Sequence, residues 1–117
     1  MSIIQANRLR GVSKSIVILD GNGDALVSGA NDVIRVRIGR EGTIDTAPIL
    51  TVSSDGATAA GSSFTKNSPS DGTNLLRLDA TDLDFSPGTY TLAVDYFDNA
   101  DASEWKNVSR QVFVLTE

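Results

Sequence analysis

Short runs of alternating apolar and polar residues extend along the chain, separated by segments rich in Gly, Asn, Asp, Ser and Pro. Alternation with a period of two is typical of β-strands that bury one face, and the separating residues favour turns. Residues 33–40 (VIRVRIGR) show it most clearly, because the apolar residues fall on one face and Arg35 and Arg37 on the other. The pattern predicts an all-β protein in which this strand has one wet face.

Seven segments have the apolar pattern of a strand. They are Ser15–Leu19, Val33–Arg40, Ile49–Ser53, Ser62–Lys66, Asn74–Leu78, Thr89–Phe97 and Val108–Leu115. No long amphipathic helix separates them, and only Thr81–Phe85 has the pattern of a helical turn. Successive strands joined by turns favour a sandwich over a parallel sheet with crossover helices. We therefore expect an antiparallel β-sandwich of about seven strands.

Glycine-rich turn chemistry follows the first predicted strand, in Asp20–Asp24 (DGNGD). Asp and Asn side chains bond their own backbone in turns, and glycine adopts positive φ without strain. The segment shares its opening with EF-hand calcium loops, but such a loop needs Gly where Ala25 stands and Glu where Asn31 stands. We therefore predict a turn and no metal site. Two longer polar links, Ser54–Gly61 and Asn67–Thr73, are predicted to be mobile surface loops.

The most specific segment is Asp82–Tyr90 (DLDFSPGTY), which leads into the long alternating strand TLAVDYF. It resembles the connection between strands E and F of immunoglobulin-like domains, where an acidic residue, a Gly and a Tyr form a tyrosine corner. The resemblance implies that Tyr90 is the corner and that its hydroxyl bonds to nearby backbone. Leu92 stands where antibody domains have a cysteine, so the implied class is the broader immunoglobulin-like one.

The order of elements across Ser13–Glu117 carries a second resemblance, through a DGNGDAL turn, an NDVIRVRI strand, a PGTYTLAVDYFD strand and a terminal QVFVL strand. This order is similar to small immunoglobulin-like domains of tailed-phage virions, which include capsid decoration proteins and the amino-terminal domains of baseplate proteins. The chain stops directly after its last strand, which makes a stand-alone decoration protein the better fit. The resemblance implies a location in the virion and the major capsid protein, or another virion protein, as partner.

Charge narrows the range of partners. Ten Lys and Arg against fifteen Asp and Glu leave a net charge of -5, which disfavours binding to nucleic acid and to anionic membranes. No apolar run approaches the length of a membrane span, and Met1–Arg10 lacks the apolar region of a signal peptide. We expect synthesis in a host cytoplasm. The chain has no cysteine, which removes disulfides and thiolate metal sites.

Catalytic chemistry has little support in the sequence. The chain has no His and no Cys, and it lacks the motifs of serine hydrolases, phosphate loops and dinucleotide sites. A glycosidase needs paired carboxylates, and acidic residues do crowd the second half of the chain. They are Asp79, Asp82, Asp84, Asp95, Asp98 and Asp101. Their positions in turns and on outward strand faces indicate solvated charge, so we expect a protein that is not an enzyme and holds no cofactor.

Trp105 is the single tryptophan and lies in the polar segment Asp98–Asn107. One interpretation is a lid that folds over the open end of the sandwich and covers core residues. The other is an exposed anchor at an end-loop binding site, as in sugar-binding modules and interface hot spots. Sugar-binding sandwiches usually gather several aromatic residues on one face, whereas aromatic residues make up only 6% of this chain.

Residues 1–12 precede the domain predicted at residues 13–117, and they form either an N-terminal arm or an edge strand. As an edge strand, one of two adjacent isoleucines faces the core and the other faces solvent. As an arm, the segment becomes ordered on the partner, where the isoleucines fill a groove and the arginines pair with acidic residues. The residues concerned are Ile3, Ile4, Arg8 and Arg10.

The sequence thus predicts an immunoglobulin-like β-sandwich that acts as a structural and interaction protein. The first hypothesis is a phage capsid decoration protein that binds the outer surface of the major capsid protein shell. The alternatives are a carbohydrate-binding or adhesin module and a tail or baseplate accessory domain. The candidate partner-binding residues are Ile3, Ile4, Arg8, Arg10 and Trp105.

Overall fold

The computed structural model describes residues 3–19, 22–56, 61–68, 70–98 and 105–117. These residues form eight strands and one short 3₁₀ helix, η1. The elements are β1 (Ile3–Asn7), β2 (Val12–Val17), β3 (Val33–Gly39), β4 (Leu50–Ser53), β5 (Ser63–Thr65), β6 (Thr73–Leu78), η1 (Ala80–Asp82), β7 (Gly88–Phe97) and β8 (Lys106–Thr116). No helix in the described ranges is long and apolar enough to cross a membrane.

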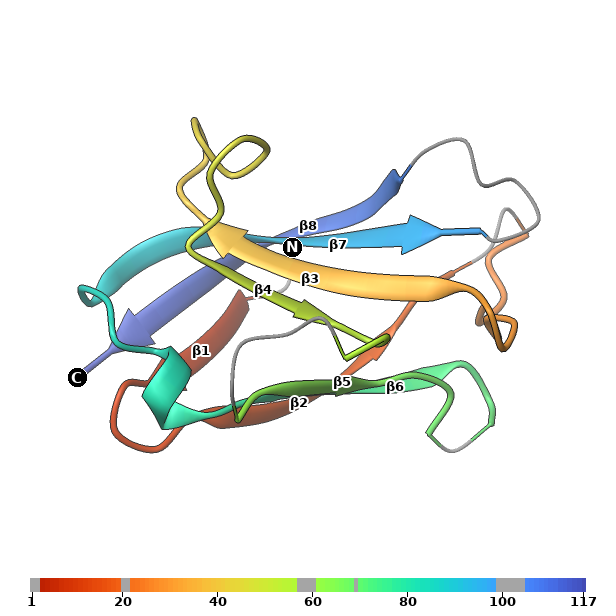
Figure 1. Cartoon of the computed structure of the whole chain (residues 1–117), viewed down its shortest axis with the longest axis horizontal. Coiled ribbons are helices and arrows are strands. Elements are labelled where there is room, and N and C mark those ends of the chain that lie inside the picture. Colours follow the sequence, from red (N-terminus) through yellow and green to blue (C-terminus); the bar gives the residue numbers. More distant parts are fainter. Residues whose placement is uncertain (1–2, 20–21, 57–60, 69, 99–104) are drawn as a thin grey trace.

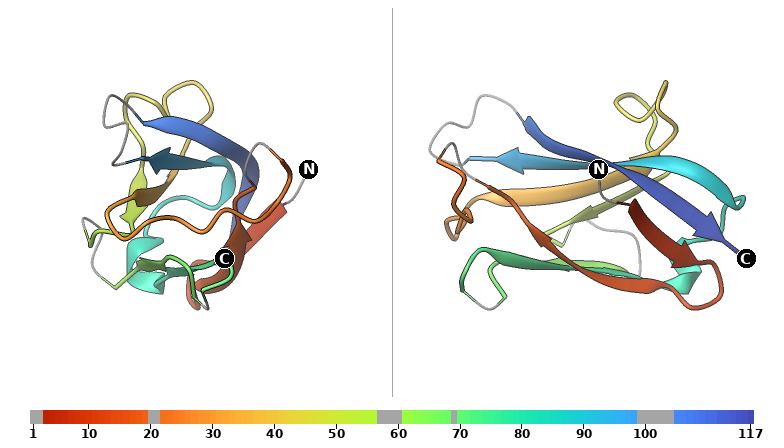
Figure 2. Two further views of the ribbon diagram at one scale, coloured as in Figure 1. Left: turned by 90° about the vertical axis from the view of Figure 1, so that its right-hand side faces the viewer. Right: turned by 180° about the vertical axis from the view of Figure 1, so that it is seen from behind.

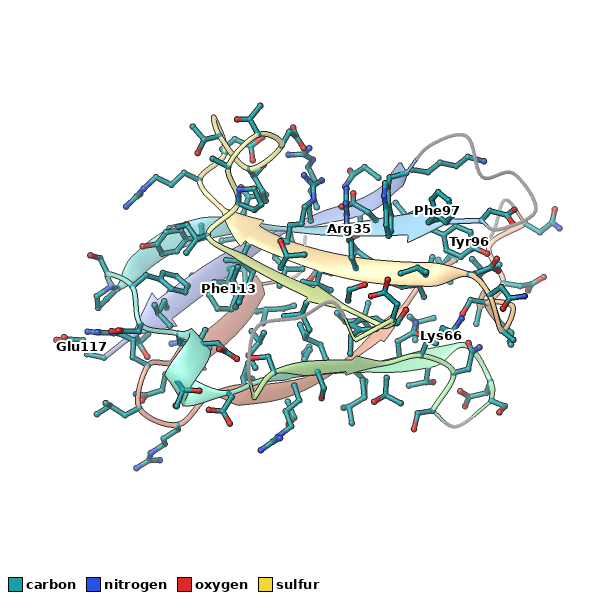
Figure 3. The ribbon with its side chains drawn as sticks, in the orientation of Figure 1. Arg35, Lys66, Tyr96, Phe97, Phe113 and Glu117 are labelled. Atoms are coloured by element: carbon teal, nitrogen blue, oxygen red, sulfur yellow. The ribbon has the colours of Figure 1, made fainter. Side chains whose placement is uncertain are left out.

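The strands lie in two layers that face each other (Figures 1 and 2). The larger sheet has five strands in the order β1-β8-β7-β3-β4, and the smaller has three in the order β2-β6-β5. Apolar side chains from both sheets fill the space between them, and Phe113 lies there (Figure 3). Val36, Leu92 and Phe113 have no exposed surface, and burying such a side chain stabilises the fold by about 1.5–3 kcal/mol. The protein is an all-β, two-sheet sandwich, as predicted.

All seven predicted strands are present, with shifted ends. The largest shift is in β2, which begins at Val12 and not at Ser15, because β6 pairs with it as far as Leu78. The eighth strand, β1, runs parallel to β8, so the prediction of an antiparallel sandwich is wrong for this pair. The reason is that the turn after β1 leads into β2 in the other sheet, so β1 forms no antiparallel hairpin with the next strand. β1 therefore joins the edge of a strand from the far end of the chain.

Residues 3–7 of the N-terminal segment form a strand at the edge of the five-stranded sheet. Ile4 is 2% exposed and belongs to the core, whereas its neighbour Ile3 is 61% exposed. This is the edge strand, with one isoleucine inward and the other outward. The turn to β2 ends at Gly11, which has a φ of 73° and lies so close to β6 that an added Cβ would be 2.2 Å from the carbonyl oxygen of Leu78. Residues 3–7 therefore belong to the five-stranded sheet.

The predicted turn after β2 lies partly outside the described residues, which omit residues 20–21. Where the chain is described again, Ala25 forms a β-bridge with Leu19, and the Leu26 N–H donates to the Ile18 carbonyl at 2.7 Å. These contacts are those of a chain that reverses direction between β2 and residue 25.

The two predicted mobile loops also lie partly outside the described residues, which omit residues 57–60 and 69. The helical turn predicted at Thr81–Phe85 corresponds to η1, which begins one residue earlier at Ala80. Asp79 caps η1, because its side chain accepts a hydrogen bond from the Thr81 N–H at 3.0 Å.

Candidate functional site

A buried carboxylate lies on the outer face of the five-stranded sheet, on the side away from the core. Asp95 of β7 stands directly opposite Arg35 of β3 in the antiparallel register. The Arg35 Nε donates to Asp95 Oδ2 at 2.9 Å. Arg37 donates two hydrogen bonds to the same carboxylate, from Nε to Oδ2 at 2.5 Å and from Nη2 to Oδ1 at 3.1 Å. Asn107 of β8 adds a bond from Nδ2 to Oδ1 at 3.1 Å.

A loop covers this ion-pair cluster from the solvent side. Residues 40–48, here called the covering loop, rise above the large sheet between β3 and β4 (Figure 1). The Arg37 Nη1 donates to the Ile44 carbonyl and to Asp45 Oδ1, both at 3.2 Å. Arg110 Nη2 of β8 holds both carboxylate oxygens of Asp45, at 2.9 and 3.0 Å. As a result Asp95 is only 2% exposed and Arg37 only 7%.

This burial corrects two predictions. The face of β3 that carries Arg35 and Arg37 was expected to be wet, and Asp95 was expected to be solvated surface charge. Both expectations fail at Arg37 and Asp95, because charges of opposite sign meet across β3 and β7 and because the covering loop bonds to Arg37. Arg35 keeps 27% of its side chain exposed. A buried charge is tolerated only when it is paired and hydrogen-bonded, and this carboxylate has four such bonds.

The charges of the cluster are held in their ionised forms. Burial by itself would raise the pKa of Asp95, but the hydrogen bonds from Arg37, Asn107 and Arg35 outweigh it and hold the pKa below its ordinary value. Burial likewise opposes the charge of Arg37, yet its bonds to Asp95 and Asp45 raise its pKa. The hydrogen bond from Arg110 is the largest cause of the lowered pKa of Asp45. The cluster therefore stabilises structure and presents no proton donor or acceptor poised near neutral pH.

Trp105 lies on this same outer face, beside the cluster. The guanidinium carbon of Arg35 stands 4.0 Å from the centre of the indole ring, and the Phe97 ring lies 5.3 Å away at a tilt of 48°. Figure 3 shows Arg35 and Phe97 together on the outer side of the sheet. Trp105 thus packs against two side chains of the large sheet. It is half-buried and contacts two side chains.

The other candidate binding residues are dispersed. Arg8 forms ion pairs with Asp84 at 3.5 Å and with Glu117 at 3.4 Å. Arg10 lies in the turn between β1 and β2, where its N–H donates to the Asn7 carbonyl at 3.1 Å. Ile4 is in the core, and Ile3 and Leu9 are exposed. The structure therefore does not join the N-terminal residues and Trp105 into one site.

Tyr90 makes the hydrogen bond that a tyrosine corner requires. Its hydroxyl donates to the carbonyl of Ser86, four residues earlier. Phe85 packs edge-on against the Tyr90 ring, with 5.1 Å between the ring centres, and the Arg40 guanidinium lies 5.0 Å from the ring centre. Tyr90 is 5% exposed, so its side chain is a packed part of the core.

A second polar cluster joins the loop before β3 to the small sheet. The Tyr96 hydroxyl donates to Asp32 Oδ2 at 2.6 Å, and burial followed by this bond raises the Tyr96 pKa. The Lys66 ammonium donates to the backbone carbonyls of Gly29, Ala30 and Asp32, below Tyr96 in Figure 3. These hydrogen bonds hold the loop before β3 against Lys66 and Tyr96. Within the described residues, no group of three or more His, Cys, Asp or Glu side chains is arranged to hold a metal ion.

One surface that the sequence analysis missed is apolar. Ile16–Leu19, Val108 and Ser109 line a groove of about 250 Å³ between β2 and β8. Val17, Leu19 and Val108 are 50%, 61% and 42% exposed. A signal was available, because Ser15–Leu19 (SIVIL) is apolar at four consecutive positions and a strand with apolar residues on both faces exposes one set unless something covers it.

Comparison with known proteins adds no identification. No family model matches the chain, and no curated protein is significantly similar to it.

Proposed function

We propose that this sandwich is of the immunoglobulin-like kind. Three features of strand pairing and one hydrogen bond support the proposal. The first strand pairs in parallel with the last, β3 pairs with both β4 and β7, and β2 and β5 flank β6 in the opposite layer. Tyr90, at the start of the long strand β7, bonds back to the Ser86 carbonyl, which is the contact of a tyrosine corner.

The corner has its own test. Tyr90→Phe removes one hydrogen bond and should cost about 0.5–1.5 kcal/mol of the free energy of unfolding. Tyr90→Ala leaves a large cavity and should cost about 3–5 kcal/mol. Equilibrium denaturation in urea measures both, and a negligible cost for Tyr90→Ala would contradict the corner.

We propose that the protein acts by binding, as a decoration protein on the capsid of a tailed phage, where it attaches to the outer surface of the major capsid protein shell. The observation that carries the binding function is the contrast between polar and apolar surfaces. The ion-pair cluster on the outer face is bonded within itself and to the covering loop, whereas the groove between β2 and β8 exposes Val17, Leu19 and Val108. Exposed apolar groups gathered at a groove mark interaction sites. The capsid as partner rests on the resemblance to virion domains.

Purified virions test the capsid assignment. Mass spectrometry should find the chain in phage particles, in a fixed ratio to the major capsid protein. Purified protein should also saturate capsids that lack it. If the chain is missing from virions and does not bind shells, the decoration function is wrong. If it is found on isolated tails and not on capsids, the tail or baseplate alternative replaces it.

The carbohydrate-binding alternative is less well supported. A sugar stacks on the open face of an aromatic ring, and the Arg35 guanidinium already covers one face of the Trp105 ring. A glycan array decides the matter. Decoration predicts no glycan binding, whereas an adhesin predicts binding that weakens in Trp105→Ala.

A further inference from the structure

The Lys66 ammonium lies among backbone carbonyl oxygens of the loop before β3. It donates to the carbonyls of Gly29 at 2.5 Å, of Ala30 at 3.3 Å and of Asp32. An ammonium has three N–H donors, so these carbonyls can satisfy all of them. All three acceptors are neutral oxygens. The positive charge is therefore held by carbonyl dipoles, in the way that a bound cation is held.

A tight turn places the three carbonyls around one point. The Asp32 N–H donates to the Gly29 carbonyl at 3.1 Å, and the Gly29 N–H donates to Asp32 Oδ2 at 2.7 Å. The Tyr96 hydroxyl donates to the same carboxylate oxygen at 2.6 Å and so joins the turn to β7. Figure 3 shows Lys66 and Tyr96 at the same end of the sandwich. The bonds that shape the turn thus do not depend on the ammonium.

The residues next to the turn and next to Lys66 are also joined. Asn67 Nδ2 donates to the Ser28 carbonyl at 2.7 Å, and the Ser28 N–H donates to Asn67 Oδ1 at 3.2 Å. Asn67 has a φ of 55°, a left-handed conformation that Asn adopts more readily than most residues. Its own N–H donates to the side chain of the buried Asn74 at 3.1 Å. These bonds hold the turn beside residue 66 without help from the lysine side chain.

We propose that residues 29–32 form a binding site for a small monovalent cation, and that Lys66 is its built-in occupant. Carbonyl oxygens replace the water around a monovalent cation. Divalent cations fit less well, because calcium takes about six to eight oxygen ligands, with carboxylates among them, and magnesium keeps much of its water. If the ammonium is removed and the turn persists, the site should bind ammonium or potassium from solution. This inference does not rest on the proposed binding function.

A purely structural role for Lys66 predicts something different. If the lysine only ties the small sheet to the loop through its covalent side chain, no free cation can restore that tie. If its charge fills a cation site, a free cation of the right size can take its place. A ligand that binds only the folded protein stabilises it, so rescue by a cation distinguishes the two roles.

Lys66→Met tests the site, because methionine keeps most of the side-chain stem and leaves room only where the ammonium was. The melting temperature is measured in ammonium, potassium and tetramethylammonium chloride at equal ionic strength. Tetramethylammonium is too large for the site and has no N–H donor. With a dissociation constant of about 0.1 M, about 0.5 M ammonium should raise the melting temperature by about 4 °C over tetramethylammonium. Equal melting temperatures in the three salts would overturn the proposal.

Lys14→Met is the matched control, because it makes the same chemical change at an exposed position on β2. This variant and the unaltered protein should show little difference between ammonium and tetramethylammonium chloride. A rise in the control equal to that in Lys66→Met would show a general effect of the salt and would contradict the site.

NMR locates the bound cation and decides the case in which Lys66→Met does not fold. Titration of the folded variant with ammonium chloride should shift the amide resonances of residues 29–32 to saturation and leave those of the unaltered protein in place. Shifts that do not saturate, or that lie elsewhere, would overturn the proposal. If the variant is unfolded in tetramethylammonium chloride, a folded spectrum in ammonium or potassium chloride supports the site. An unfolded spectrum in all three salts contradicts it.

Discussion

The outer face of the large sheet and the groove between β2 and β8 both border solvent, and they differ in how their side chains are satisfied. On the outer face, Asp95, Arg35 and Arg37 bond to one another under the covering loop. At the groove, Val17 and Val108 are exposed. The first region uses its chemistry to hold the sandwich together. The second contributes little to stability as it stands, which makes it the better place to seek a partner.

The largest expected effect is on the ion-pair cluster. Asp95→Asn removes the buried negative charge that Arg35 and Arg37 share and leaves Arg37 with only the exposed Asp45 as an acidic partner, so the free energy of unfolding should fall by about 3–5 kcal/mol. Urea denaturation measures it. Asp84→Asn is the control, because its side chain is 88% exposed and pairs only at the surface, and it should cost less than about 1 kcal/mol. Equal losses of free energy of unfolding in the two variants would show that the ion-pair cluster does not stabilise the sandwich more than a surface ion pair does.

The dependence of stability on pH should come next. Because the folded pKa of Asp95 is lowered, its contribution is complete above the unfolded pKa of about 3.9 and is lost as the pH falls through the folded value. The free energy of unfolding should therefore decline in acid. Asp95→Asn should show a shallower decline over the same range. A variant with the slope of the unaltered protein would indicate that Asp95 is not the titrating group, and that acids such as Asp45, Asp71 or Asp79 account for the decline.

A smaller effect is expected where Trp105 meets Arg35. Trp105→Leu keeps an apolar side chain on the outer face but loses the aromatic ring under the guanidinium, which should cost about 0.5–1 kcal/mol. Thermal unfolding resolves such a change. No measurable loss would show that the stacked pair does not stabilise the fold, and the ring would again be a candidate for binding.

The smallest effect on stability is expected at the groove. Val17→Ser and Val108→Ser should each change the free energy of unfolding by less than about 0.5 kcal/mol, because both side chains are largely exposed. The comparison is with Val36→Ser, where a side chain without exposed surface is replaced. If either groove variant approaches the cost of Val36→Ser, the groove belongs to the core and is not an open surface.

Local patterns predicted most of the strands, because each depends on residues within one segment. The alternation in residues 33–40 placed β3 correctly, and the alternation in Thr89–Phe97 placed β7, which begins one residue earlier at Gly88. β1 was left open between two alternatives. A five-residue segment has no pattern that distinguishes an edge strand from an arm, and its pairing depends on β8, more than a hundred residues away.

The sequence by itself determined that the chain is an all-β sandwich, since period-two alternation and turn residues act locally. Only the tertiary structure decided which charged side chains would be buried. Asp95 is buried because β3 and β7 are neighbours and because the covering loop folds over them. It also decided that Val17 and Val108, from opposite ends of the chain, share one groove. Alternation indicates that a strand has two faces, but what covers each face depends on elements distant in sequence.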